Sequence, residues 1–138
     1  MAIVKLSKKG EYALRALSCL VRHWGQGPVA IRVIADEEQI PRKFLEQILL
    51  ELRRDGLVES TRGAAGGYRL LKDPETVSVA RVVRLIDGPL APLRCVSRTA
   101  LIRCPREEGC GLRLVMGEVR EAIADVLEAR TLADIAGR

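Results

Sequence analysis

Residues 34–58, with the sequence IADEEQIPRKFLEQILLELRRDGLV, contain the pattern that decides the fold. Apolar residues recur here every three or four positions, which predicts a short helix over residues 31–39 and a longer one from Pro41 to Asp55. Proline suits the first position of a helix, where a backbone N–H would have no partner within the helix, and Gly56 ends the second helix. Two helices joined by a tight turn predict a helix-turn-helix.

The residues that follow predict a β-hairpin. Short strands with an alternating pattern, at 57–62 and 68–71, flank the glycine-rich loop GAAGG at 63–67. Because a hairpin beside a helix-turn-helix forms a wing, we expect the segment 29–72 to be a winged helix-turn-helix that binds DNA.

The rest of the chain predicts further helices, so the expected fold class is mainly α. Ser7 caps a first helix whose apolar face extends to Trp24, and a short helix is expected over 79–87. The expected organisation has three parts: a winged helix-turn-helix domain at 1–87, a cysteine-containing loop at 88–111, and a long dimerisation helix with a C-terminal turn at 112–138.

Composition and charge narrow the function. With 138 residues and 48% hydrophobic residues, the chain can bury one core, while 3% aromatic residues disfavour RNA binding by base stacking. Residues 1–72 contain 13 lysines and arginines against 8 acidic residues, whereas residues 73–138 contain 10 of each. The whole positive excess therefore lies in the half with the helix-turn-helix. No apolar run is long enough for a membrane and no export signal is evident, so we expect a cytoplasmic protein.

A recognition helix must expose polar and cationic residues while its opposite face is buried. Arg42, Lys43, Glu46 and Gln47 meet that requirement, because arginine and lysine pair with guanine or phosphate, glutamine with adenine, and glutamate with cytosine. The same four residues would also suit an ordinary solvated helix face. The tight turn before the helix and the basic hairpin after it favour the DNA-binding interpretation.

The hairpin offers a second set of candidate DNA contacts. Arg62 and Arg69 flank the glycine loop, and the backbone N–H groups of Gly66 and Gly67 can approach phosphates closely. The alternative is a plain surface turn with incidental arginines.

Three of the four cysteines lie in the predicted loop. Cys95, Cys104 and Cys110 follow a C-x8-C-x5-C spacing, and soft thiolates suit iron–sulfur clusters and zinc. The spacing lacks the C-x2-C of common zinc sites, so metal binding and redox-active thiols both remain open on spacing alone. Cys19 is expected in the core of the first helix, and the single histidine, His23, at the surface.

The long C-terminal helix predicts a homodimer. Its apolar stripe either packs within the chain or against a second copy, and the small head favours the second copy. Two-fold symmetry would present two recognition helices to a near-palindromic operator in double-stranded DNA. The stripe consists of Leu112, Val115, Met116, Val119, Ala122, Ile123, Val126 and Leu127.

Three blocks, LSKKGEYALRAL, IADEEQIPRKFLEQILLELRRDGLV and STRGAAGGYRL, resemble the IscR/NsrR-type family of bacterial winged-helix regulators. The resemblance implies a dimeric repressor or activator that carries a [2Fe-2S] or [4Fe-4S] cluster on the three loop cysteines. It places DNA contacts at Arg42, Phe44, Glu46, Gln47 and Arg62.

The resemblance also suggests a fourth cluster ligand. Some members use a carboxylate from the first helix of the partner subunit, and the matching position here is Glu11. The alternative for Glu11 is a surface ion pair with Arg15, one helical turn away.

The expected function is therefore a DNA-binding transcription regulator that senses iron, redox state or nitric oxide through an iron–sulfur cluster. Two alternatives remain: a winged-helix regulator that uses thiol oxidation or zinc at the same cysteines, and a protein-interaction adaptor without its own operator. An enzyme is not expected, because the chain has one histidine and no phosphate-cradling motif before a helix.

Overall fold

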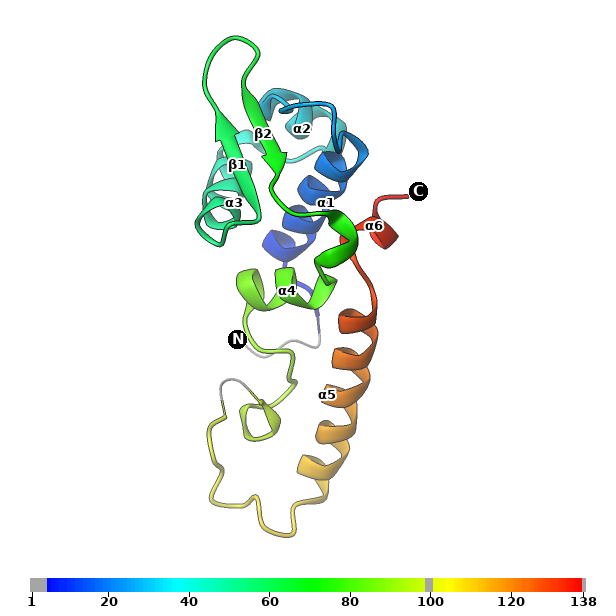
Figure 1. The fold of residues 1–138 in the computed structure, drawn as a ribbon. Helices are drawn as coiled ribbons and strands as arrows, with labels where there is room; N and C mark the ends of the chain where they lie inside the picture. Colours follow the sequence, from blue (N-terminus) through cyan, green and yellow to red (C-terminus); the bar gives the residue numbers. More distant parts are fainter. Residues whose placement is uncertain (1–4, 99–100, 138) are drawn as a thin grey trace.

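The computed structural model describes residues 5–98 and 101–137, so residues 1–4, 99–100 and 138 of the three expected parts lie outside the described residues. The fold is mainly helical with one two-stranded antiparallel sheet, which confirms the winged helix-turn-helix class (Figure 1). In chain order the elements are α1 (Lys8–Arg22), α2 (Ile31–Glu38), α3 (Arg42–Arg54), β1 (Val58–Thr61), β2 (Gly67–Leu70), the 3-10 turn η1 (Pro74–Thr76), α4 (Val79–Asp87), the 3-10 turn η2 (Arg94–Val96), α5 (Gly111–Ala129) and α6 (Leu132–Ile135).

Helix α1 is fixed at its start by a contact across the fold. The hydroxyl oxygen of Ser7 accepts a hydrogen bond from Gly10 N at 2.9 Å, as expected of a capping residue. The Asp87 carboxylate accepts hydrogen bonds from the Ser7 backbone N–H and hydroxyl, so the start of α1 is joined to the end of α4. The expectation that the apolar face extends to Trp24 is wrong, because α1 ends at Arg22 and Trp24 is 44% exposed in the turn beyond it.

The turn between α2 and α3 is short. Gln39 takes a left-handed conformation (φ 53°), and Ile40 N donates to Ala35 O at 3.0 Å, which closes the end of α2. Pro41 was expected as the first residue of α3, but its ψ of 129° makes it the N-cap, and the helix begins at Arg42. The difference is one position, and the Pro41 carbonyl still accepts from Leu45 N at 2.9 Å.

The wing is anchored in the fold at its base. Strands β1 and β2 pair from Val58 with Leu70 to Thr61 with Gly67, and both residues of the first pair are buried. Tyr68 exchanges two backbone hydrogen bonds of 2.8 Å with Val29, which joins the hairpin to the segment before α2. The wing therefore has a fixed position relative to the helix-turn-helix.

The core lies around α1, which packs against α2, α3, α4 and α6. Its largest fully buried side chains are Leu17, Leu20, Ile34, Leu45, Ile48, Leu49, Leu52, Leu57, Leu132, Val58, Val77 and Val82. Leu132 comes from α6, so the C-terminal turn that the sequence grouped with the long helix packs into the head, a name we use for α1–α4, the wing and α6. Two hydrogen bonds hold it there, from Val79 N to Arg130 O at 2.9 Å and from Leu132 N to Val77 O at 3.0 Å.

Helix α5 extends away from the head, with the segments 88–98 and 101–110 beside it (Figure 1). Its C-terminal half contacts the head, where Ile123 and Leu127 pack against Val79 and Val83 of α4. We call residues 88–130 the arm. Several apolar side chains of the predicted stripe and its surroundings are exposed in the single chain, namely Leu112, Leu114, Val115 and Val126. Within residues 5–98 and 101–137, no helix combines the length and apolar character that crossing a bilayer requires.

The packing of α6 gives a test of the fold. We expect Leu132→Ala to lower the free energy of unfolding by about 2–5 kcal/mol, because it leaves a cavity in the core. Ile135→Ala, in the same short helix, is the matched control and should cost less than about 1 kcal/mol, because Ile135 is 38% exposed. Urea denaturation of both variants measures the difference. Equal losses would contradict the placement of α6 in the core.

Candidate functional site

Helix α3 presents a polar outer face. Arg42, Lys43, Glu46 and Gln47 are all exposed on it, and the opposite side of the helix is buried in the core. Arg42 and Glu46 form only a loose ion pair, with 3.9 Å between Nε and Oε1, and both side chains are more than half exposed. The pair can therefore open at little cost, which leaves both side chains available for contact with DNA.

Phe44 has a different position from the other predicted contacts of α3. Its ring is half-buried and meets the ring of Tyr12 edge to face, with 5.5 Å between centroids. This contact fixes α3 against α1. In this structure Phe44 therefore orients α3 from its inner side. The predicted DNA contacts of α3 that face outward are Arg42, Lys43, Glu46 and Gln47.

The wing separates the predicted arginines into two environments. Arg62 is exposed where the glycine loop begins, whereas Arg69 pairs across the sheet with Glu59, the residue directly opposite it. The two predicted glycines are required by space: a Cβ atom on Gly67 would lie 2.1 Å from Val29 O, and one on Gly66 would lie 2.2 Å from Thr61 O. Because they lack side chains, Gly67 can lie against the backbone at Val29 and Gly66 against the backbone at Thr61.

The three loop cysteines lie along the arm as free thiols. Cys95 lies in η2, Cys104 is exposed further along the loop, and Cys110 is the N-cap of α5. The three sulfur atoms do not form a preassembled metal-binding group among the described residues. A ligand shared by all three requires the loop to close around it.

Arginines beside Cys95 make its surroundings suitable for an anionic group. A hollow of about 300 Å³ is lined by Cys95, Arg98, Arg113 and Arg120, among others. The Nε of Arg113 and both Nε and Nη1 of Arg120 are buried without a hydrogen-bond partner among the described atoms. The Nη2 of Arg120 is ion-paired with Glu121, so only part of that guanidinium lacks a partner. Guanidinium nitrogens without partners next to a thiol fit a thiolate-bound iron–sulfur cluster, which carries negative charge.

The sequence analysis did not single out these two arginines. Arg94, Arg98, Arg103 and Arg106 lie in the same loop as the cysteines along the chain. Arg98 pairs with Glu121 of α5, and Arg103 pairs with Glu107. Arg113 and Arg120 lie seven positions apart on α5, a spacing that places them on one helix face and that the sequence does contain.

Glu11 lies in the first turn of α1. Its carboxylate contacts Lys8 Nζ at 3.1 Å and an Arg15 guanidinium nitrogen at 3.6 Å. The hydrogen bond and the charge of Lys8 hold the pKa of Glu11 below its ordinary value. The ion pair with Arg15 that the sequence offered as the alternative role is therefore present. Within the described part of one chain, Glu11 does not group with the thiols.

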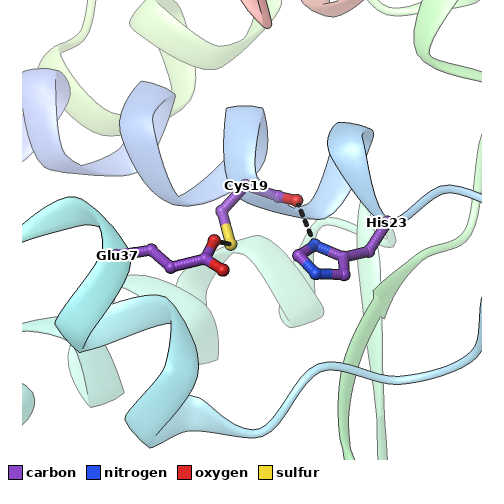
Figure 2. A group of neighbouring side chains, drawn as sticks. All are labelled: Cys19, His23 and Glu37. Carbon is purple, nitrogen blue, oxygen red and sulfur yellow. Dashed lines mark hydrogen bonds between the residues drawn. The ribbon is translucent and has the colours of Figure 1, made fainter.

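The structure brings together one group that the sequence did not reveal. Cys19 of α1, His23 at the C-cap of α1 and Glu37 of α2 each place one ligand atom within 4.8 Å of the other two (Figure 2). Cys19 is fully buried, as expected, and its Sγ donates to Glu37 Oε2 at 3.1 Å. Burial, together with the hydrogen bond to Glu37, raises the pKa of the Cys19 thiol to about 12. The Cys-x3-His spacing of Cys19 and His23 is visible in the sequence and is compatible with metal binding. Glu37 lies beside them only because of the tertiary fold.

This contrast between thiols predicts selective labelling of the folded, metal-free protein at pH 8. With a pKa of about 12, Cys19 is ionised in roughly one molecule in ten thousand at that pH, and it is buried. We expect iodoacetamide to modify exposed Cys104 and to leave Cys19 unmodified, as read by peptide mass spectrometry. Unfolded protein, labelled at all four cysteines, is the control. Modification of Cys19 as fast as Cys104 in the folded protein would contradict the burial described.

Comparison with known proteins adds to this geometry. The family model Rrf2, described as an iron-dependent transcriptional regulator, matches residues 6–138. An rrf2-like HTH-type transcriptional regulator of Rhodobacter capsulatus is 42% identical over 136 residues, which covers 94% of this chain and 91% of the relative. The solved structure of CymR, the global cysteine regulator of Bacillus subtilis, has a TM-score of 0.83 at 32% identity and covers 97% of both chains. That of IscR from T. potens has a TM-score of 0.77 at 33% identity and covers 96% of this chain and 85% of its own.

Proposed function

Because the chain belongs to the Rrf2 family of transcriptional regulators, we propose that it is a cytoplasmic, homodimeric DNA-binding regulator whose operator affinity depends on an iron–sulfur cluster held by Cys95, Cys104 and Cys110. The observation that carries the proposal is the placement of three free thiols on an arm whose two ends are joined to the DNA-binding head. The alternatives of an adaptor or an enzyme have no comparable support.

The head supplies the DNA contacts. The first turns of α3 project Arg42, Lys43, Glu46 and Gln47 toward the major groove, and the wing brings Arg62 to the adjacent backbone. The placement of the net charge of +5 supports this assignment, because the whole positive excess lies in residues 1–72. Gly66 and Gly67 keep the wing backbone in the shape that lets it approach the DNA backbone. Arg69, on strand β2, would add a contact with the DNA.

The exposed apolar side chains of α5 support a dimer. Leu112, Leu114 and Val115 project from the part of the helix that extends beyond the head, where burying them against a second copy removes them from water. An isologous pairing of two α5 helices would separate the recognition helices by about 34–36 Å or a multiple, and would match a near-palindromic operator.

The loop cysteines suit the cluster through their donor chemistry and their cationic surroundings. Cys95, Cys104 and Cys110 would supply three thiolates to a [2Fe-2S] or [4Fe-4S] cluster, with Arg113 and Arg120 beside Cys95 balancing the negative charge. Glu11 of the partner subunit would be the fourth ligand. Such a cluster supplies sensitivity to iron supply, oxidants and nitric oxide.

The arm would convey the state of the thiols to the head. The loop must close to bring Cys95, Cys104 and Cys110 together, and Cys110 caps α5 directly. A shift of α5 then acts on α4 through Ile123 and Leu127, and on α6 through the backbone that follows. The spacing of the two heads, and with it the operator affinity, would change by population shift.

A second candidate uses the same cysteines without iron, by thiol oxidation or zinc binding. Two observations favour it: the sulfur atoms are not preassembled, and the chain resembles the solved structure of a cysteine regulator. Visible absorption of protein purified anaerobically separates the candidates, because an iron–sulfur protein is brown and a thiol or zinc protein is colourless.

Removing the cluster should change DNA binding. We expect anaerobically reconstituted protein and metal-free protein to differ in operator affinity by about five- to 150-fold, the usual size of an allosteric coupling. Fluorescence anisotropy at matched salt measures both affinities. Equal affinities would contradict the proposed sensing mechanism while leaving DNA binding by the head intact.

Two substitutions separate backbone from base contacts. Arg62→Ala should weaken binding to operator and unrelated DNA alike and reduce the slope of log affinity against log salt by about one. Gln47→Ala should cost about 1–3 kcal/mol at the operator and leave binding to unrelated DNA nearly unchanged. Gln26→Ala, an exposed glutamine outside the proposed interface, is the control. The assignment would be refuted by a Gln47 variant that matches the control.

A further inference from the structure

Two elements of the head bring three different metal-ligating side chains together. Cys19 lies in the last turn of α1, His23 follows four residues later at its C-cap, and Glu37 approaches them from α2 (Figure 2). Each contributes one ligand atom that lies within 4.8 Å of the other two. The group belongs to the head, and its residues are separate from the cysteines of the arm.

The chemistry of the three ligands is that of a zinc site. Zn²⁺ binds thiolate, imidazole and carboxylate in tetrahedral geometry, with metal–ligand distances of about 2.0–2.3 Å. Those lengths place neighbouring ligand atoms about 3.5 Å apart. Cys19 Sγ and Glu37 Oε2 are 3.1 Å apart, already close to that separation, and the remaining distances need a closure of roughly 1 Å. Three protein ligands leave one position for water.

The hydrogen bond of His23 assigns its tautomer. His23 Nδ1 lies 3.0 Å from the carbonyl oxygen of Cys19, and since a carbonyl oxygen only accepts, Nδ1 must carry the hydrogen. The lone pair then lies on Nε2. Metal-bound histidines typically donate the other ring N–H to a carbonyl or carboxylate in this way, which fixes the ring and its tautomer.

The neighbouring charges allow an ion to enter. The Arg22 guanidinium is hydrogen-bonded to the carboxylate of Glu38 and lies 3.9 Å from that of Glu37. Arg22 is therefore held mainly by Glu38. When Zn²⁺ binds, the proton that Cys19 shares with Glu37 leaves to solvent, and one thiolate and one carboxylate balance the two positive charges. The imidazole is neutral. The loaded site therefore has no net charge and leaves the Arg22–Glu38 pair in place.

We propose that Cys19, His23 and Glu37 form a binding site for a zinc-like divalent cation, which fastens α2 to α1. Because α2 is the first helix of the helix-turn-helix, a bound ion would fix the support on which α3 rests. The site would thus stabilise the DNA-binding head independently of the arm.

The test uses the full-length protein with Cys95, Cys104 and Cys110 replaced by serine, so that Cys19 is the single remaining thiol. Co²⁺ is the probe, because a thiolate–Co²⁺ bond gives a charge-transfer band in the near ultraviolet. We expect one Co²⁺ per chain with that band, displaced by Zn²⁺, and a higher melting temperature when either ion is bound.

Substitutions at each ligand identify the site. Cys19→Ser should abolish the band, and His23→Gln or Glu37→Gln should weaken Co²⁺ binding by at least about tenfold. Asp36→Asn, which removes an exposed carboxylate from the same helix, is the matched control and should bind as the parent does. Circular dichroism verifies that each variant is folded.

Two results would overturn the proposal. One is the absence of the band in the folded parent. The other is a band that Glu37→Gln and His23→Gln leave unchanged, which would mean that Cys19 binds the ion with different partners. If the triple-serine protein does not fold, Co²⁺ titration of wild type against Cys19→Ser decides instead, with one fewer equivalent bound by the variant expected and equal stoichiometry contradicting the site.

Discussion

The backbone connection between the start of α4 and the start of α6 is the constraint on which the arrangement of the chain depends. Val79 N donates to Arg130 O, Leu132 N donates to Val77 O, and Ser78 bridges to Thr131. The arm leaves the head at the end of α4 and returns beside the beginning of the same helix. A helix with no fully buried residue in the single chain is thereby held at its C-terminal end, while its N-terminal end carries the cysteine loop.

The cysteines lie in two different surroundings. Among the thiols of the arm, Cys95 lies next to buried arginine nitrogens without partners, which suits the proposed binding of an anionic group. Cys19 lies in the head, fully buried and hydrogen-bonded to Glu37, at the contact between α1 and the first helix of the helix-turn-helix. The proposed sensing therefore belongs to the arm, and the proposed structural ion belongs to the head.

Local patterns in the sequence predicted most of the fold. The bounds of α4, the Ser7 cap and the glycine wing follow from periodicity and capping, which act within a few residues. Contacts between distant residues were not predictable in this way: Asp87 on Ser7, Leu132 in the core, and Glu37 beside Cys19 each join segments far apart in the chain. The exposed side chains of α3 were predictable because a helix exposes one face, whereas the packing of Phe44 against Tyr12 was not.

Two backbone hydrogen bonds join the arm to the head where α6 returns, one from the Val79 amide and one from the Leu132 amide. Amide hydrogen exchange of the full-length protein measures how firmly they hold. We expect both amides to be protected nearly as strongly as that of Leu17 in the middle of α1. Exchange as fast as at Leu101 and Ile102, in the exposed loop, would mean that the arm moves freely of the head and that the two hydrogen bonds do not join them.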